Sequence, residues 1–189
     1  FYTVALELPG LTVSGERMAD KAAAEQLKEA CQGAAATIKK VECKEKSEKP
    51  PALYDLTTLQ RDANRLLGFT AQQTLDYLQS LYEKKLCTYP RPASRYLTGD
   101  MADSLPVLVN LVANAMPFRK GIAITCDPQT VINDKKVTDH HAVIPTRNLK
   151  DADLSALPAG EKAVLELVAL RLLCAVAYPH IYSETVVIA

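Results

Sequence analysis

Residues 53–85 read LYDLTTLQRDANRLLGFTAQQTLDYLQSLYEKK and decide the fold, because two helical patterns meet there across a very short turn. Gly68 stops the first pattern, and Thr70 with Gln73 forms a capping box that begins the second. Only Gly68, Phe69 and Thr70 join the patterns, which predicts a helix-turn-helix-like pair. The apolar positions at helical spacing are Leu56, Leu59, Ala63, Leu66 and Leu67 in the first helix, and Leu75, Leu78 and Leu81 in the second.

Strand patterns flank this helical region on both sides. Residues 1–8 alternate as a half-buried strand before a Pro9-Gly10 turn, and the charged segment 37–46 is typical of an edge strand. A polar linker is expected at 44–51, which ends in two prolines. The further expected elements are a helix from Asp20 to Ala30 ended by Gly33, a helix at 105–115, irregular chain at 116–150, a buried helix at 159–177 and a strand from Ser183.

The predicted fold class is therefore α+β, with a mainly helical domain between strands. Because the sequence both opens and closes in a strand pattern, we expect it to be a piece of a longer protein. The 22 Lys and Arg residues balance 22 Asp and Glu residues, which excludes a general positive field of the kind that non-specific nucleic-acid binders use. Five cysteines without a C-x-x-C spacing suggest neither zinc nor disulfides and favour the cytoplasm, and no apolar run is long enough for a membrane span.

The stretch LCTYPRPASRYL, residues 86–97, surrounds Tyr89 with cations and contains no acid. A neutral phenol is a poor nucleophile at pH 7, but cations that stabilise a phenolate and an attacked phosphodiester make it useful. Arg91 can hold two phosphate oxygens, and Pro90 stiffens the backbone between it and Tyr89. The nearby cations are Lys84, Lys85, Arg91 and Arg95. On spacing alone, an ordinary tyrosine in a basic loop remains the alternative.

Two other segments carry polar groups suited to nucleic acid. In TDHHAVIPT, residues 138–146, adjacent histidines point in different directions and make a poor metal pair, but one imidazole can bind a phosphate or protonate a leaving hydroxyl. Asp139 could orient a ring, or it could simply cap a turn with solvated histidines. The first helix also presents a polar face that could follow a phosphate backbone or could merely be solvated, formed by Gln60, Arg61, Asn64 and Arg65.

Together, the segment PPALYDLTTLQRDANRLLGFTAQQTLDYLQSLYEKKLCTYPRPASRYLT and the later DHHAVIPT resemble the type IA DNA topoisomerases, in particular the bacterial topoisomerase III branch. The order of the two blocks matches, and His140 follows Tyr89 by 51 positions. The resemblance implies that residues 51–179 form the helical domain with the active-site tyrosine. It also implies that 1–50 belong to a β-rich arch or gate domain, to which 180–189 return as a strand.

The resemblance further implies the chemistry and its participants. Tyr89 would attack single-stranded DNA to form a 5′-phosphotyrosyl bond without ATP, Arg91 would stabilise the phosphate, and His140 would contact DNA near the active site. His141, Arg95, Arg61 and Gln60 are the further DNA-binding candidates. Magnesium would be bound by a toprim domain, which this chain is expected to lack, so no cofactor and no metal ligand are expected within it. The expected partners are single-stranded DNA and the remaining domains of the parent chain.

One departure from the family pattern leaves an alternative open. The family usually continues Pro-Arg-Thr-Asp-Ser after the tyrosine, whereas this chain has Pro92 and Ala93 in place of the Thr-Asp pair. The alternative function is therefore a degenerate, non-catalytic DNA-binding or structural domain. A protein-interaction module unrelated to DNA would require both matched blocks to be coincidental.

Overall fold

A computed structural model describes residues 1–116 and 124–188 of the chain. It divides into two compact units, which we describe separately. Unit 1 comprises Phe1–Lys46 and Ile181–Ala189, and unit 2 comprises Ser47–His180. The assignment of unit 1 to an arch domain stays a prediction. None of the described helices is long and apolar enough to cross a membrane.

Unit 1 begins with a β-hairpin and a capped helix. Strands β1 (Ala5–Leu8) and β2 (Leu11–Ser14) pair antiparallel, with Leu8 opposite Leu11. The expected Pro9-Gly10 turn joins them, and Gly10 takes the positive φ of 80° that such a turn requires. All β1 side chains are exposed, so the expected half-buried alternation is wrong, because a two-stranded sheet has too little packing surface to bury a face. Helix α1 (Lys21–Cys31) begins where Asp20 accepts a hydrogen bond from Ala22 N at 3.0 Å.

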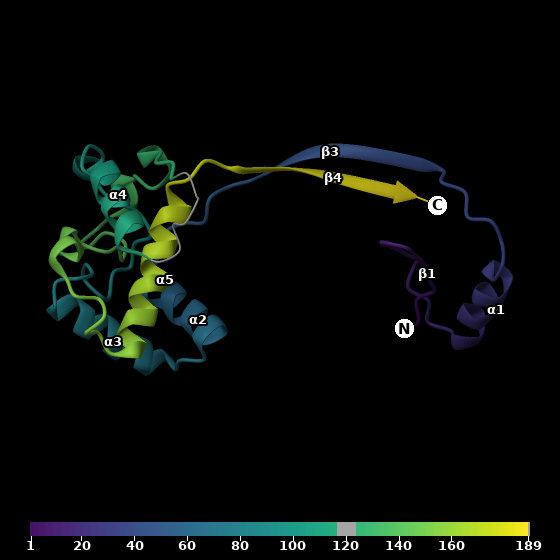
Figure 1. Cartoon of the computed structure of the whole chain (residues 1–189), viewed down its shortest axis with the longest axis horizontal. Helices are drawn as coiled ribbons and strands as arrows, with labels where there is room; N and C mark the ends of the chain where they lie inside the picture. Colours follow the sequence, from purple (N-terminus) through teal and green to yellow (C-terminus); the bar gives the residue numbers. More distant parts are fainter. Residues whose placement is uncertain (117–123, 189) are drawn as a thin grey trace. The chain divides into compact units, whose positions relative to one another are not determined.

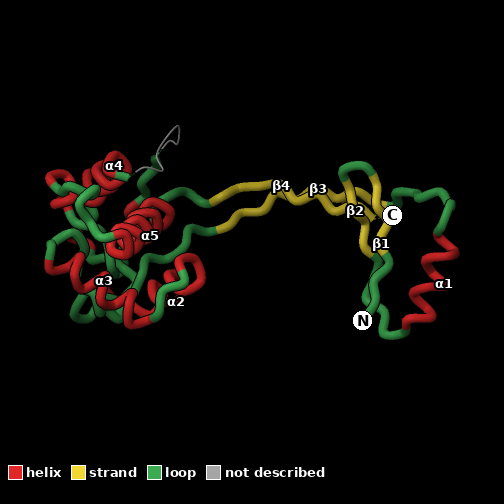
Figure 2. The backbone as a smooth tube through the Cα atoms, turned by 60° about the horizontal axis from the view of Figure 1, so that its bottom comes forward, coloured by secondary structure: helices red, strands yellow, loops and turns green. Residues whose placement is uncertain are grey.

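A second sheet pairs two segments that lie far apart in the sequence. Strand β3 (Lys40–Glu48) pairs with β4 (His180–Ile188), and Figure 2 shows the two strands running side by side. β3 begins three residues later than predicted and continues through most of the expected linker, while β4 begins three residues earlier than predicted. Pairing explains these shifts, since each strand extends as far as its partner supplies hydrogen bonds and cross-strand contacts such as Lys46 Nζ–Glu184 Oε2 at 2.5 Å.

Unit 2 is built from four α-helices within the described residues: α2 (Leu56–Leu67), α3 (Ala71–Glu83), α4 (Leu105–Ala115) and α5 (Ala159–Ala175). Figures 1 and 2 both place α5 among the other three, and α5 packs on each of them. The α+β class and the α2–α3 pair are confirmed. Short 3₁₀ turns in the described part of this unit occupy Gly99–Met101, Pro128–Thr130, Asp134–Lys136 and Arg147–Asp151. The chain expected to be irregular at 116–150 has no α-helix or strand where it is described, and its residues 117–123 lie outside the described residues.

Local signals set the ends of the helix pair. The predicted capping box of Thr70 and Gln73 is present at the start of α3, with Gln73 N donating to Thr70 Oγ1 at 3.1 Å. Gly68 ends α2 with a φ of 72°, a conformation that costs glycine no steric strain. A second capping box, which the sequence analysis missed, joins Asp55 and Thr58 at the start of α2, where Thr58 N donates to Asp55 Oδ1 at 2.7 Å.

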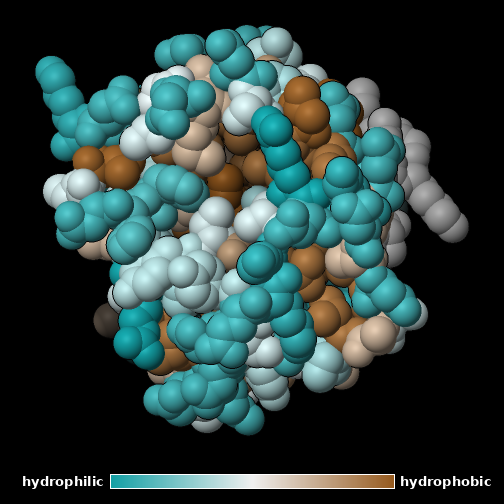
Figure 3. Space-filling model, turned by 90° about the vertical axis from the view of Figure 1, so that its left-hand side faces the viewer, coloured by the Kyte–Doolittle hydropathy of each residue, from teal (hydrophilic) through white to brown (hydrophobic). Residues whose placement is uncertain are grey.

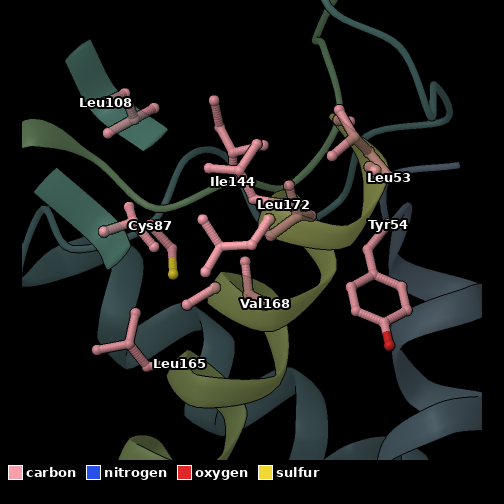
Figure 4. Packing of buried hydrophobic residues seen from close by; sticks show 14 of the residues in the cluster. Leu53, Tyr54, Cys87, Leu108, Ile144, Leu165, Val168 and Leu172 are labelled. Atoms are coloured by element: carbon pink, nitrogen blue, oxygen red, sulfur yellow. The ribbon is translucent and has the colours of Figure 1, made fainter. Parts of the chain in front are cut away.

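The core of unit 2 surrounds α5. Val168 and Leu172 of α5 lie beside Cys87 and Ile144, while Tyr54 lies toward the other side of the helix (Figure 4). The outer face shown in Figure 3 is largely hydrophilic, with hydrophobic side chains in separate patches. The core therefore packs Leu86 and Cys87, together with segment 142–144, from the two quoted motifs, against one central helix.

The close approach of Gly160 to the Tyr77 ring predicts a loss of stability when a side chain is added there. A Cβ added at Gly160 of α5 would lie 2.3 Å from Cζ of Tyr77 in α3, whose ring also meets Phe69 edge to face at a centroid distance of 5.3 Å. We expect Gly160→Ala to lower the free energy of unfolding by about 1–3 kcal/mol through overpacking, although alanine favours a helix. Urea denaturation of the chain followed by circular dichroism measures this loss.

As a control, the Gly160→Ala substitution is also made in a Tyr77→Ala variant, which lacks the aromatic ring. In Tyr77→Ala, the methyl group of Gly160→Ala has room, so the same substitution is expected to be neutral or stabilising there. Equal losses in both backgrounds would contradict the assignment of the cost to the Tyr77 ring.

Candidate functional site

Backbone hydrogen bonds join the tyrosine motif to the histidine motif. Thr88 N donates to Ile144 O at 3.0 Å, and Thr146 N donates to Leu86 O at 2.9 Å, on either side of an antiparallel bridge between Cys87 and Pro145. The extended chain needed here follows from Pro145 and Pro90, which both exclude a helix. This pairing brings together two segments more than fifty residues apart in the sequence.

The histidine motif is also anchored on its other side. Val143 N donates to Tyr54 O at 2.8 Å, and Ala142 N donates to Tyr96 O at 3.0 Å. Residues Ala142, Val143 and Ile144 are at most 1% exposed. Segment 142–145 is therefore a buried connecting strip between the start of α2 and both ends of the tyrosine motif, whereas Asp139 and His140 before it are exposed and Asp139 does not begin a helix.

The pairing places three aromatic rings in contact. The rings of Tyr89 and His140 are stacked, with centroids 4.0 Å apart and planes inclined by 26°. Tyr82, from the last turn of α3, meets Tyr89 edge to face at a centroid distance of 5.9 Å. Tyr89 is half-buried and His140 exposed, so the phenol and the imidazole edge are open to a ligand. Stacked planes do not place an imidazole nitrogen in line with the phenol hydroxyl, and no hydrogen bond between these two described residues is formed.

Side chains around Tyr89 alternate between the interior and the surface. Pro90 and Pro92 are buried, while Arg91 and Ala93 are exposed. The two prolines thus fasten the loop to unit 2 and leave the Arg91 guanidinium facing solvent, where an anionic ligand can reach it. Burial raises the pKa of the neighbouring Cys87 thiol to about 12, so this cysteine is a neutral packing residue.

Two of the cations near Tyr89 in the sequence serve the fold. Lys84 forms an ion pair with Glu161 of α5, and Ser80 Oγ donates to the same carboxylate at 2.9 Å. Arg95 donates from Nε to Leu53 O at 2.9 Å. Lys84 is therefore paired with Glu161, and Arg95 as a DNA-binding residue stays a prediction that must share its guanidinium with the backbone.

The remaining predicted DNA-binding residues have mixed surroundings. Gln60 Nε2 donates to Ala71 O at 2.9 Å and Asn64 Nδ2 to Phe69 O at 3.0 Å, so both amides support the α2–α3 turn. Arg61 is exposed on α2. His141 Nδ1 lies 2.9 Å from Ala142 O, which orients its ring along the strip. Of the predicted set, the structure brings together Tyr89 and His140, with Arg91 two residues further on.

A polar cluster that no sequence motif indicates joins the start of α2 to α5. The Arg171 guanidinium of α5 lies over the Tyr54 ring at 4.2 Å, donates to the Tyr54 hydroxyl at 2.9 Å and pairs with Asp62. Burial, followed by the hydrogen bond to Asp62, raises the pKa of Tyr54 to about 12. Burial alone would raise the pKa of Asp62, but the Tyr54 hydrogen bond and the charges of Arg171 and Arg65 outweigh it and lower that pKa. Only contacts across more than a hundred positions reveal this cluster.

The residues around Tyr89 do not fit a magnesium site. Mg²⁺ prefers carboxylate oxygens and water, whereas the described contacts of Tyr89 are two aromatic rings, Tyr82 and His140. Within residues 1–116 and 124–188, no group of three or more His, Cys, Asp or Glu side chains is placed to hold a metal ion. We therefore derive no step through a metal bound by these residues.

Comparisons with known proteins agree with the two motifs. A family model described as DNA topoisomerase matches residues 1–189. The chain is 41% identical over 165 residues to DNA topoisomerase 3 of Shouchella clausii, covering 84% of the chain and 22% of that protein. It is 39% identical over 167 residues to DNA topoisomerase 3 of Bacillus subtilis, again covering 84% and 22%. The chain thus spans about a fifth of the length of the curated relatives it matches.

A solved structure has the same fold. Full-length topoisomerase I from Thermotoga maritima superposes with a TM-score of 0.70 over 97% of this chain and 30% of that chain, at 23% identity. At this identity the likeness concerns the fold alone. With a family model that matches from the first residue to the last, and relatives at about 40% identity that are named DNA topoisomerase 3, this chain belongs to the DNA topoisomerase family.

Proposed function

We propose that this chain is the tyrosine-bearing part of an enzyme that cuts and rejoins one strand of DNA through Tyr89. The observation that carries the proposal is the Tyr89–His140 stack, which unites the two family motifs at one half-open site beside Arg91. The substrate in this proposal is single-stranded DNA, whose extended backbone can reach a phenol held in a surface loop.

The proposed reaction is a transesterification. The Tyr89 oxygen bonds to a backbone phosphorus, the bond from phosphorus to the 3′ oxygen breaks, and the phenol loses its proton while the 3′ oxygen gains one. One DNA end then carries a 5′-phosphotyrosyl bond and the other a 3′ hydroxyl. Attack by that hydroxyl reverses the step, and ATP is not required because one phosphodiester is exchanged for another.

Each neighbouring side chain has a proposed task. Arg91 faces solvent and would pair with the non-bridging oxygens of the attacked phosphate, where charge accumulates. The stack fixes the plane of the Tyr89 ring, and the free edge of the His140 imidazole would bind an adjacent phosphate. Because the two rings are stacked, we assign His140 to binding and orientation and not to removal of the phenol proton.

The proton transfer and the magnesium belong, in this proposal, to another domain of the parent protein. Family resemblance assigns both to a toprim domain, and the residues around Tyr89 do not provide a carboxylate cluster. We therefore expect residues 1–189 alone to be inactive and to act only together with the remaining domains. A cytoplasmic location is part of the same proposal.

The test asks which of the two DNA fragments produced by cleavage is covalently attached to the protein. The parent protein is incubated with magnesium and single-stranded DNA labelled at either its 5′ or its 3′ end, and then denatured with detergent. The proposal predicts protein attached to the 3′-labelled fragment, while the 5′-labelled fragment runs free. Attachment to the 5′-labelled fragment would contradict the proposed bond.

Absence of any adduct would instead favour the non-catalytic alternative, in which Pro92 and Ala93 mark lost chemistry. Ala93 is exposed, so Ala93→Asp can restore the family's acid without disturbing the core. If this variant forms the adduct and the unchanged protein does not, the alternative holds for the natural chain.

A further inference from the structure

The hydroxyl of Thr88, next to Tyr89, joins the backbones of the two motifs. Thr88 Oγ1 donates to Ala142 O at 3.2 Å and accepts from Ile144 N at 3.0 Å. The Thr88 amide independently donates to Ile144 O at 3.0 Å. A single residue thus makes three hydrogen bonds to the histidine motif, immediately before the tyrosine.

The surroundings make these bonds hard to replace by water. Ala142 and Ile144 are 0% and 1% exposed, and Thr88 itself is half-buried. If the hydroxyl is removed, the Ile144 N–H loses its acceptor in an enclosed place, and the local chain must shift to find another. The Ala142 carbonyl also lies 2.9 Å from His141 Nδ1, so a shift there reaches the histidine pair directly.

We infer that Thr88 is a positioning residue that holds Tyr89 against His140 in the geometry needed for attack. This inference rests on the proposed function. The segments that carry the Tyr89 and His140 rings are also joined by backbone hydrogen bonds at Leu86 and Tyr96, which lie further from Tyr89 in the sequence than Thr88 does. Without the hydroxyl, the Tyr89 loop keeps its prolines and its backbone pairing but loses two of the three hydrogen bonds that Thr88 makes to the histidine motif. Misplacement of a reacting group by about 1 Å can cost about 10²-fold in rate.

Three variants of the parent protein test this inference. Thr88→Val removes the hydroxyl with little change of shape, and Thr88→Ser keeps it. Thr130→Val is the matched control, because Thr130 Oγ1 also donates to backbone carbonyls, at 2.8 Å to Ala175 O and 2.7 Å to Asp127 O, outside both motifs. The measured quantities are the rate of DNA cleavage at saturating single-stranded DNA and the Kd for the same DNA.

We expect Thr88→Val to lower the cleavage rate by about 10–100-fold with an unchanged Kd, because Thr88 positions the nucleophile and does not bind DNA. Thr88→Ser and Thr130→Val are expected to keep the rate of the unchanged protein. A rate for Thr88→Val equal to that of Thr130→Val, or a change confined to Kd, would overturn the inference. If Thr88→Val does not fold, Thr88→Ala against Thr88→Ser makes the same comparison.

A second measurement follows the ring stack without requiring activity. The chain has only 3 histidines, so its imidazole proton signals can be resolved by NMR and assigned with His140→Gln. Stacking at 4.0 Å shifts the His140 ring protons upfield, and Thr88→Val is expected to move them toward the values of a solvated histidine while Thr88→Ser does not. An unchanged His140 signal in Thr88→Val would overturn the inference, whether or not cleavage is observed. Absence of cleavage by the unchanged parent protein would instead contradict the proposed function.

Discussion

Tyr89→Phe is expected to abolish DNA cleavage by the parent enzyme, with residual activity at least about 10⁴-fold lower, because the substitution removes the attacking oxygen. The phenyl ring keeps the stack on His140 and the edge contact with Tyr82, so binding of single-stranded DNA should persist. Relaxation of negatively supercoiled plasmid measures the first effect, and a DNA-binding titration at fixed salt measures the second.

Tyr82→Phe is the matched control for this prediction. Tyr82 is a neighbouring tyrosine that contacts Tyr89, and at 41% exposure it is open to solvent. Relaxation should continue in Tyr82→Phe. A variant pair in which Tyr82→Phe is inactive and Tyr89→Phe active would transfer the nucleophile to Tyr82 and contradict our assignment.

Arg171→Met is expected to cost about 2–3 kcal/mol of stability, which is less than breaking a fully buried ion pair because both partners are partly accessible. The Arg171 and Asp62 side chains are 19% and 17% exposed, and the guanidinium also covers the Tyr54 ring. Methionine retains the apolar contact but leaves Asp62 without its main cation. Urea denaturation, followed by the circular dichroism signal of α-helices, reports on unit 2, because most of the helical residues lie there.

The control for Arg171 is Arg65→Met. Arg65 pairs with the same Asp62 at 3.3 Å, but its side chain is 67% exposed, so we expect a loss below about 0.5 kcal/mol. The pKa of Asp62 is lowered in the folded chain, so the stabilisation is present above its ordinary value of 3.8 and is lost as the pH falls through the folded pKa. The difference between the unchanged chain and Arg171→Met should therefore shrink as the pH falls below 3.8. A difference that stays constant as the pH is lowered from 7 to well below 3.8 would assign the loss to packing alone.

The helix pair could be predicted from the sequence because its signals are local. The Gly68 stop and the capping box of Thr70 and Gln73 each act within a few residues, and both are present in the structure. The ends of β3 and β4 could not be predicted as well, since each strand ends where its distant partner does. The ion pair of Lys84 could not be predicted for the same reason, because its partner Glu161 lies 77 positions away.

The site was predictable only in part. The spacing of Tyr89 and His140 says nothing about their distance in space, and their association was expected from family resemblance alone. The structure explains it by the hydrogen bonds of Thr88, Ile144 and Leu86, which no periodicity of a single segment reveals. The Tyr54–Asp62–Arg171 cluster could not be predicted because its members come together only when α2 and the residue two positions before it pack against α5.

The most direct test of the central claim is to identify the residue that carries DNA. The adduct formed by the unchanged parent protein with single-stranded DNA is digested with protease and nuclease, and the nucleotide-bearing peptide is sequenced by mass spectrometry. We predict a nucleotide joined through its 5′ phosphate to Tyr89, within the peptide LCTYPR of residues 86–91. A nucleotide on any other residue, Tyr82 included, would contradict the account.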